Sequence, residues 1–598
     1  MMFFDIFIGI FAIFVSPQIF IYYKFEDAKY SLVLAYGLIV SFSFSWILFL
    51  IGYWLNLGGT VLFQVLVFTC LSSLLYLFTH KNTRPSKNYI IWAVALVALT
   101  PLSSYVGMGY TEWDGIVSWN RWAIELSSNN FKPFNAAYPV LLPSLWSLIY
   151  KIQGTSEIWW TGQLTLFVFP IITLVILLTL FLETKNKTFI FIAIFLYPFL
   201  IWWPVFGGGM DMPVMLMGIL SLVMAYTAEI QKENKDFAKY AFAAILTAGI
   251  STIIKQSGFA FLIFNFIFAL ANLKSFPSKK TLLKCSLGSL LYFSSFLVIF
   301  FQIRNNPISN LGHLKELSEK RIIIDRGFWE LYEPFWDQYF FYPPRVDWLD
   351  HLLAPEGPLV FAPYLIGIAL ALFFFKGTGK FRSVSFLSAI FFFLGVILWV
   401  KFFSYDTRNS YWTKAFYITF VSINLNFALV YIIKTYKSLS QNKPKLIFDK
   451  KHIALILIIG AFIYAFNTPN QLLYEVQAEY QKNLGRKILA QRMNRLLKDS
   501  DKCTLMFTNR EILTYNHYLK RYRDQVIYFG YQISGLLKEI KHDCKDGRYF
   551  VIHPRAARQP GWKLFVEAKN KGLIKLIGTR NHRIYYVPPS SDYTAPSP

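Results

Sequence analysis

Residues 31–55 read SLVLAYGLIVSFSFSWILFLIGYWL, an apolar run without a charged side chain. A helix of about 20 apolar residues is long enough to cross the hydrocarbon core of a bilayer. The stretch is therefore predicted to be a transmembrane helix. Similar runs recur along the chain, so the same reasoning extends to most of the protein.

The composition agrees with a membrane protein. Of the 598 residues, 55% are hydrophobic and 16% are charged, whereas soluble globular proteins carry about 25% charged residues. Aromatic residues reach 19%, including 60 Phe, and Trp and Tyr are common where helices meet the membrane surface. The fold class we predict is a polytopic all-α membrane protein with a small C-terminal extracytoplasmic α/β domain.

We predict about 14 transmembrane helices from runs near the length that a bilayer requires. The predicted spans are Phe3–Tyr22, Ser31–Leu55, Thr60–Phe78, Tyr89–Tyr105, Trp159–Leu182, Phe189–Val205, Met212–Tyr226, Ala241–Ile254, Phe259–Ala271, Leu282–Ile303, Leu359–Phe375, Val384–Phe402, Ala415–Ile433 and Ile453–Phe466.

The loops between these spans alternate in charge, and this alternation predicts the orientation. Short loops that stay in the cytoplasm are enriched in Lys and Arg, which explains part of the net charge of +25. Placing every second loop inside puts both termini outside. The composition suggests a bacterial inner membrane. The basic loops contain Lys24 and Lys29; Lys81, Arg84 and Lys87; Lys185 and Lys187; Lys232, Lys235 and Lys239; Lys274, Lys279 and Lys280; Lys376, Lys380 and Arg382; Lys434, Lys437, Lys443 and Lys445.

The chain divides into four parts: N-terminal helices (1–105), a first large periplasmic loop (106–157), the remaining membrane region (158–466, with an outer loop at 304–358) and a soluble periplasmic domain (467–598). In that last part, strand-like runs at 504–508, 525–529, 549–553 and 583–587 alternate with helical patterns at 471–498 and 562–571. Such alternation suggests an α/β module. Cys503 and Cys544 could form a disulfide there.

Acidic residues directly follow a predicted span in the first large loop. Glu112 and Asp114 lie in the sequence GYTEWDGIVSWNRWA, at 109–123. A carboxylate at the membrane surface can accept a proton from an attacking hydroxyl, or it can hold a cation. The alternative is a solvated loop acid, which is the usual case for a single Asp.

Two further charges lie where apolar sequence is interrupted. Asp211 follows three glycines in GGGMDMP, at 207–213, and could bind a ligand or simply cap a helix. Lys255 lies in IKQSG, at 254–258, within an otherwise apolar region. A charge at that depth is a functional candidate by default, with snorkelling to the outer interface as the alternative.

A third segment, FSYDTRN at 403–409, contains Tyr405 and Arg408. A guanidinium matches the oxygen pair of a phosphate, although a surface pair with Asp406 is the other interpretation. No GxxxxGK[ST], HExxH or CxxC pattern occurs in the sequence, which argues against ATP hydrolysis in the cytoplasm.

Together these segments resemble the GT-C fold glycosyltransferases. The likeness rests on the Trp-Asp motif ending at Asp114, on WNRWA at 119–123 and on YPVLLP at 138–143, with MDMP, KQSG and SYDTRN in later loops. Within this fold, the sequence more specifically resembles the bacterial members related to protein O-mannosyltransferases and to the lipid A aminoarabinose transferase. Departures are the Glu-x-Asp spacing of the acids and three additional spans before the first loop.

The resemblance implies an inverting transfer of a sugar from a polyprenyl phosphate to an envelope acceptor: a glycan, a lipopolysaccharide or a protein. Asp114 would be the general base and Asp211 would assist it or orient the acceptor, while the role of Glu112 stays open. Lys255 and Arg408 would neutralise the phosphate. Tyr405, Arg121 and Tyr138 are the other expected substrate contacts. A divalent cation is possible, no metal ligand is assigned and no nucleic acid is expected.

Two other functions remain compatible with the sequence: a transporter or flippase for a lipid-linked sugar, and a non-catalytic envelope assembly protein. A transporter should carry its charges near the membrane midplane and on broken helices. An assembly protein would not need Asp114, Asp211, Lys255 and Arg408 to converge. The clustering of these charges on the predicted outer loops favours the enzyme.

Overall fold

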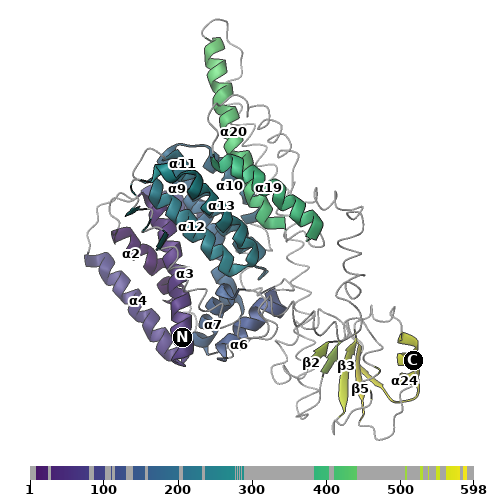
Figure 1. Cartoon of the computed structure of the whole chain (residues 1–598). Helices are drawn as coiled ribbons and strands as arrows, with labels where there is room; N and C mark the ends of the chain where they lie inside the picture. Colours follow the sequence, from purple (N-terminus) through teal and green to yellow (C-terminus); the bar gives the residue numbers. More distant parts are fainter. Residues whose placement is uncertain are drawn as a thin grey trace. The chain divides into compact units, whose positions relative to one another are not determined.

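The protein is described here by a computed structural model (Figure 1). It describes residues 8–24, 29–79, 87–100, 110, 115–129, 139–154, 159–200, 207–231, 236–276, 278, 280–281, 283, 286–287, 383–402, 410–440, 505–507, 526–528, 537, 540, 547–552, 561–578 and 583–588.

The chain forms two compact units. The first consists of residues 1–110 and 122–472, and the second of residues 111–121 and 473–598. The described helices of the first unit are α2 (Ser16–Lys24, preceded by the π-helical turn η1, Phe11–Val15), α3 (Tyr30–Trp54), α4 (Gly59–Thr79), α5 (Lys87–Ala98), α6 (Arg121–Ser127, whose first residue belongs to the second unit), α7 (Leu141–Gln153), α8 (Trp159–Leu164), η4 (Thr165–Phe167), α9 (Val168–Thr184), α10 (Thr188–Leu200), α11 (Asp211–Ile230), α12 (Phe237–Ile254), η6 (Gln256–Gly258), α13 (Phe259–Ala271), η7 (Leu273–Ser275), α19 (Ser383–Phe402) and α20 (Tyr411–Ser440).

Most of the predicted spans coincide with these helices. Among the described residues, 6 helices are long and apolar enough to cross a membrane, which is the pattern of a multi-pass membrane protein. Helix α20 begins four residues before the predicted span and continues to Ser440. The predicted spans at 359–375 and 453–466, and most of the one at 282–303, fall outside the described residues, so the total of about 14 spans stays a prediction.

Helix α11 lies at the centre of the first unit, and α4 lies at its edge. In the most apolar stretch of α11, 89% of the residues are buried, against 17% in α4. Helices α11, α12 and α13 pack side by side (Figure 1). The exposed side of α4 carries large apolar side chains such as Phe68 and Leu71. An apolar surface of this kind is compatible with lipid, because exposing apolar side chains to lipid tails has no free-energy penalty.

The predicted first loop contains helices of its own. Helix α7 is buried along Leu141–Tyr150 and packs on α3 and α4. Its Trp146 donates a hydrogen bond from the indole nitrogen to Thr165 Oγ1, at 2.9 Å. With 13 residues, α7 is shorter than a span requires, which is why counting apolar runs left it in the loop.

Two glutamates near the C-termini of helices accept hydrogen bonds from the N-termini of other helices. Glu183, at the end of α9, accepts bonds from Ser31 N at 3.0 Å and from Ser31 Oγ at 2.5 Å. Glu229, at the end of α11, accepts bonds from Ser383 N at 2.5 Å and from Ser383 Oγ at 2.8 Å. The first N–H groups of a helix have no partner within it, so each carboxylate satisfies donors that lipid could not.

These contacts group the helix ends into two sets, and each set contains ends that the charge alternation predicts to lie on the same side of the membrane. The starts of α3, α12 and α19 lie with the ends of α9 and α11, and the pair Lys29–Asp236 at 3.8 Å belongs to the same group. All are predicted cytoplasmic ends. At the other ends, Tyr197 of α10 donates a hydrogen bond to Ala98 O of α5, at 2.9 Å. Which of the two groups faces the periplasm stays a prediction.

The second unit contains a five-stranded sheet of order β2-β1-β3-β5-β4. Its strands are β1 (Leu505–Phe507), β2 (Val526–Tyr528), β3 (Arg548–Ile552), β4 (Lys575–Gly578) and β5 (Arg583–Val587), with α24 (Trp562–Asn570) between β3 and β4. Strand β1 is parallel to β2 and β3, and β5 is antiparallel to β3 and β4. The predicted strands are confirmed, and β4 was not predicted.

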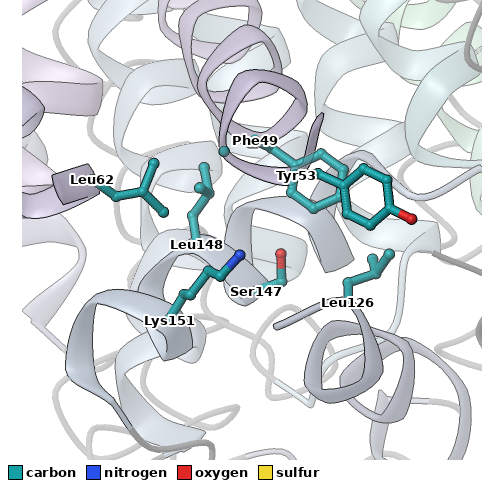
Figure 2. A pocket seen from close by; sticks show the side chains of 8 residues that line it. Phe49, Tyr53, Leu62, Leu126, Ser147, Leu148 and Lys151 are labelled. Carbon is teal, nitrogen blue, oxygen red and sulfur yellow. The ribbon is translucent and has the colours of Figure 1, made fainter. Parts of the chain in front are cut away.

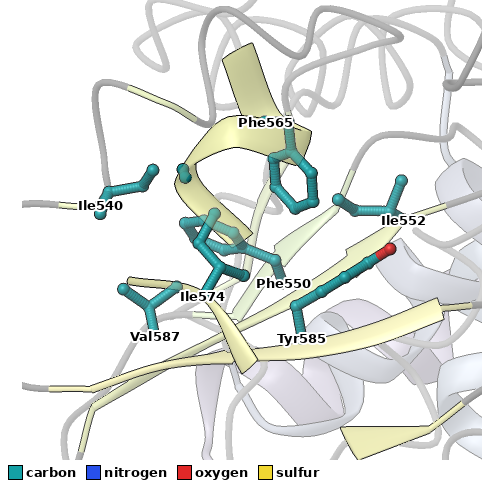
Figure 3. Close-up of a cluster of buried hydrophobic side chains, with 8 residues drawn as sticks. Ile540, Phe550, Ile552, Phe565, Ile574, Tyr585 and Val587 are labelled. Carbon is teal, nitrogen blue, oxygen red and sulfur yellow. The ribbon is translucent and has the colours of Figure 1, made fainter. Parts of the chain in front are cut away.

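The core of this unit lies between α24 and the sheet (Figure 3). Phe565 of α24 packs edge-on against Tyr585 of β5, with the ring centroids 4.9 Å apart. Phe550 and Ile552 of β3 are fully buried beside them. The helix predicted at 471–498, together with Cys503 and Cys544, falls outside the described residues. The periplasmic location of this unit stays a prediction.

Candidate functional site

Asp211 is the first residue of α11. The N-cap is Met210, which makes no side-chain capping bond, so the interpretation of Asp211 as a simple N-cap is wrong. Its carboxylate lies at the positive end of the helix dipole, a position that favours an anion. Pro213 suits the first turn because it has no N–H to satisfy. Gly208, with φ of +94°, adopts a conformation that a residue with a Cβ rarely takes.

Lys255 lies in the turn between α12 and α13, as predicted. Its backbone is extended, with φ of −156° and ψ of 152°, and its N–H donates to Ser251 O at 3.2 Å. A cation at a helix C-terminus is favoured by the dipole. The turn therefore holds the ammonium group where α12 itself stabilises a positive charge.

The two charged side chains form an ion pair. Lys255 Nζ lies 2.6 Å from Asp211 Oδ1, and the side chains are 16% and 13% exposed, respectively. The antiparallel packing of α11 and α12 brings the start of one helix to the end of the other. Because the ammonium group binds a carboxylate, Lys255 does not need to snorkel to the interface, which was the alternative interpretation of this residue.

A close backbone contact fixes the turn that carries Lys255. A Cβ built on Gly258 would lie 2.3 Å from both C and O of Ser251. The Ser251 hydroxyl lies 3.3 Å from Gly258 O, to which it can donate. A side chain at position 258 would push the turn away from α12, so this glycine helps to set the position of Lys255.

The segment with the acidic motif starts at an anchored residue. Tyr110 is 1% exposed, and its ring lies 4.5 Å from that of Trp146 in α7. Tyr110 also occupies the space in which a Cβ on Gly162 would lie, 2.3 Å from the Tyr110 hydroxyl. This aromatic contact fixes the chain just before Glu112 and Asp114.

The structure brings together Asp211 and Lys255 of the predicted site. Glu112, Asp114, Tyr138, Tyr405 and Arg408 fall outside the described residues. Arg121 begins α6 and belongs to the second unit. The catalytic role of Asp114 and the substrate contacts of the other residues therefore stay predictions.

A functional candidate that the sequence analysis missed lies at the start of α20. Lys414 is only 2% exposed, and its Nζ lies 4.3 Å from the ring centroid of Tyr411 and 5.2 Å from that of Phe199. Phe199 is at the end of α10, so Lys414 is at the same end of the bundle as Asp211 and Lys255. The signal in the sequence was a charge only one residue beyond the predicted outer loop.

A small pocket lies between α3, α4, α6 and α7, with about 210 Å³ of empty space that includes open solvent. Figure 2 shows Lys151, Ser147 and Leu148 on one side and Phe49 and Tyr53 on the other. Partial burial lowers the pKa of the Lys151 ammonium group below 10.5. Its Nζ donates to Asn129 Oδ1 at 2.5 Å.

Binding of a divalent cation stays a prediction. Within the described part of the chain, no three His, Cys, Asp or Glu side chains form a group that could hold a metal ion. Glu112 and Asp114, the acids for which a cation was considered, are not among those residues.

Comparisons with known proteins give one structural likeness. No family model matches the sequence, and no curated protein matches it. The crystal structure of ArnT from Cupriavidus metallidurans in the apo state aligns with a TM-score of 0.48 and 11% sequence identity, over 83% of this chain and 97% of that chain.

Proposed function

We propose that this protein is an inverting glycosyltransferase that moves a sugar from a polyprenyl-phosphate carrier to an envelope glycan, lipopolysaccharide or protein. The observation that supports this most is the Lys255–Asp211 pair, at the predicted periplasmic end of two packed apolar helices. A charge pair in that place suits the headgroup of an anionic lipid whose chain lies in the bilayer.

In this proposal the acceptor hydroxyl attacks the anomeric carbon, and Asp114 accepts its proton. The bond from that carbon to the phosphate oxygen breaks, and the electron pair leaves with the polyprenyl phosphate. Lys255 and Arg408 offset the charge on the leaving group. Attack from the face opposite the phosphate inverts the anomeric centre.

The ion pair suggests a specific role for Asp211. Because Lys255 Nζ lies 2.6 Å from Asp211 Oδ1, the carboxylate holds in place an ammonium group of the kind that donates hydrogen bonds to a phosphate. Asp211 then acts through Lys255 as a positioning residue, a more specific role than orienting the acceptor.

A transporter for a lipid-linked sugar is the second candidate. Discontinuous helices near the midplane are typical of transporters, and the turn of η6 between α12 and α13 is an interruption of that kind. However, this turn joins two antiparallel helices at their ends, rather than breaking one helix at mid-depth. The position of Lys255 therefore favours a site at the membrane surface.

Envelope glycans analysed by mass spectrometry provide the test. A strain without the protein is compared with strains restored with wild type, Asp114→Asn, Lys255→Met or Lys239→Met. The control Lys239 belongs to a predicted cytoplasmic loop, and its side chain is 54% exposed. We expect wild type and Lys239→Met to restore one sugar, and the other two variants to fail although well expressed. Full restoration by Asp114→Asn would refute its role as the base.

A further inference from the structure

The second unit carries a large positive charge. Residues 473–598 contain 23 Lys and Arg against 11 Asp and Glu, which gives a net charge of +12 out of +25 for the whole chain. The enrichment of Lys and Arg in short cytoplasmic loops explains charge between membrane spans. It does not apply to a folded unit with a sheet and a core of its own, so the charge of this unit needs a separate explanation.

Part of this charge gathers at one place on the described surface. Lys569 and Lys571 lie at the end of α24, and Lys575 begins β4. All three residues are exposed, and none of them forms an ion pair with a described residue. The dipole of α24 favours a cation in its last turn, which accounts for Lys569. It does not account for Lys575, which lies in a strand.

Two exposed apolar side chains follow these lysines in β4. Leu576 and Ile577 are 36% and 37% exposed, and β4 is the outermost strand of the sheet, beside β5. Leu576 pairs with Tyr585, whose ring packs against α24, so Leu576 lies on the α24 side of the sheet. Lysine stems can lie along apolar surface while their ammonium groups reach a polar layer. Lysines next to apolar side chains are typical of segments that bind a membrane interface.

The course of the chain keeps this unit close to a bilayer. The unit is joined to the first one at three places in the sequence: between residues 110 and 111, 121 and 122, and 472 and 473. The first unit has the helices of a multi-pass membrane protein. The second unit therefore cannot diffuse away from the membrane. A tethered domain binds a nearby surface at a high effective concentration, so a contact of a few lysines is sufficient.

From these observations we propose that the end of α24 and strand β4 form a surface that binds the anionic headgroups of membrane phospholipids. Lys571 and Lys575 contact the lipid phosphates, and Leu576 and Ile577 enter the headgroup layer. A soluble polyanion would match the charge but would not bury the exposed apolar pair. The inference goes beyond the proposed function, because it requires neither sugar transfer nor a particular side of the membrane.

The test is hydrogen exchange, read by mass spectrometry on peptides that cover residues 573–578, with the full-length protein in nanodiscs. The discs contain phosphatidylcholine alone or mixed with the anionic phosphatidylglycerol. We expect phosphatidylglycerol to slow exchange in β4 severalfold, because the bound strand opens less often. High salt should remove this effect by screening the charges.

Three variants locate the effect. The double variant Lys571→Gln with Lys575→Gln should lose most of the protection. Lys575→Gln alone should lose part of it, and it serves as the test if the double variant melts at a lower temperature. Lys563→Gln is the matched control, since Lys563 is an exposed lysine of α24 that lies about 9 Å from Lys569 along the helix axis. The control should keep the protection in full.

Each contrary outcome has a distinct meaning. Equal exchange in the two lipids would overturn the proposal. Protection in both lipids that does not respond to salt would also overturn it, because β4 would then pair with a second copy or a partner protein. An equal loss in Lys563→Gln and the double variant would show that the total charge of the unit acts, rather than this surface. Protection by dissolved polyphosphate but not by phosphatidylglycerol would identify a soluble polyanion instead. None of these outcomes bears on sugar transfer, so the proposed function is tested independently.

Discussion

Lys255 Nζ lies 2.6 Å from Asp211 Oδ1, although the two residues are 44 positions apart in the sequence. Each charge lies at the helix end whose dipole favours it, because Asp211 begins α11 and Lys255 follows the last residue of α12. The helix dipoles thus stabilise the pair before any substrate binds. The contribution of the pair to stability can therefore be measured separately from its contribution to function.

Removal of one partner should destabilise the protein. We expect Asp211→Asn to lower the free energy of unfolding by about 1–3 kcal/mol, because it leaves a largely buried ammonium group without its carboxylate. Thermal unfolding in detergent measures this. The double variant Asp211→Leu with Lys255→Met should recover the stability, since an apolar pair replaces an ion pair without loss, but should restore no envelope sugar. Recovery of the sugar in the double variant would contradict the role of the pair in the site.

Gly258 should tolerate no side chain. We expect Gly258→Ala to destabilise the protein by about 1–3 kcal/mol, the usual cost of overpacking, because the new Cβ would meet backbone atoms of Ser251 at 2.3 Å. Gly58→Ala is a matched control, since no atom lies within 4 Å of its Cβ. Equal melting temperatures for the two variants would show that the turn relaxes easily.

A smaller side chain at position 261 should recover stability that a larger one at position 218 costs. A Cβ at position 218 would lie 2.2 Å from the Phe261 ring, so Gly218→Ala should cost about 1–3 kcal/mol. Phe261→Leu makes room and should recover part of that loss in the double variant. A double-mutant cycle on melting measures the coupling. An absence of coupling would contradict this packing of α11 on α13.

Glu229 should stabilise the protein by capping the N-terminus of α19 from another helix of the same chain. Its carboxylate accepts bonds from both Ser383 N and Ser383 Oγ. Glu229→Ala should cost about 0.5–2 kcal/mol, the range for losing a capping group. Glu229→Gln keeps an acceptor oxygen and should cost less. Limited proteolysis near residue 383 reports the loosening of the start of α19, and equal cleavage of all three proteins would contradict the cap.

Lys151 should titrate at a lower pH than an ordinary lysine. Its pKa lies below 10.5 because partial burial disfavours the ammonium form. Since the pKa in the folded state is lower than in the unfolded state, the folded protein binds fewer protons between the two values, and its stability rises with pH in that window. The measurement is the rate of amine acylation at Lys151 against pH, by mass spectrometry. A midpoint at or above 10.5 would contradict the prediction.

The sequence determined the membrane class, most helix positions and the alternation of the loops. These properties follow from runs of apolar residues and from the distribution of Lys and Arg, which act locally or over one loop. It also determined that Asp211 and Lys255 stand where apolar segments are interrupted, because a charge beside a span is visible in the sequence itself.

The tertiary structure decided which of these charges meet. A pair between residues 211 and 255 requires the antiparallel packing of α11 on α12, which brings two distant helix ends together. Lys414 was missed because burial by Phe199 and Tyr411 depends on the packing of α10 against α20. Apolar periodicity shows that a helix lies in the membrane. The neighbours of each face are set by side-chain packing between helices, which no local pattern in the sequence encodes.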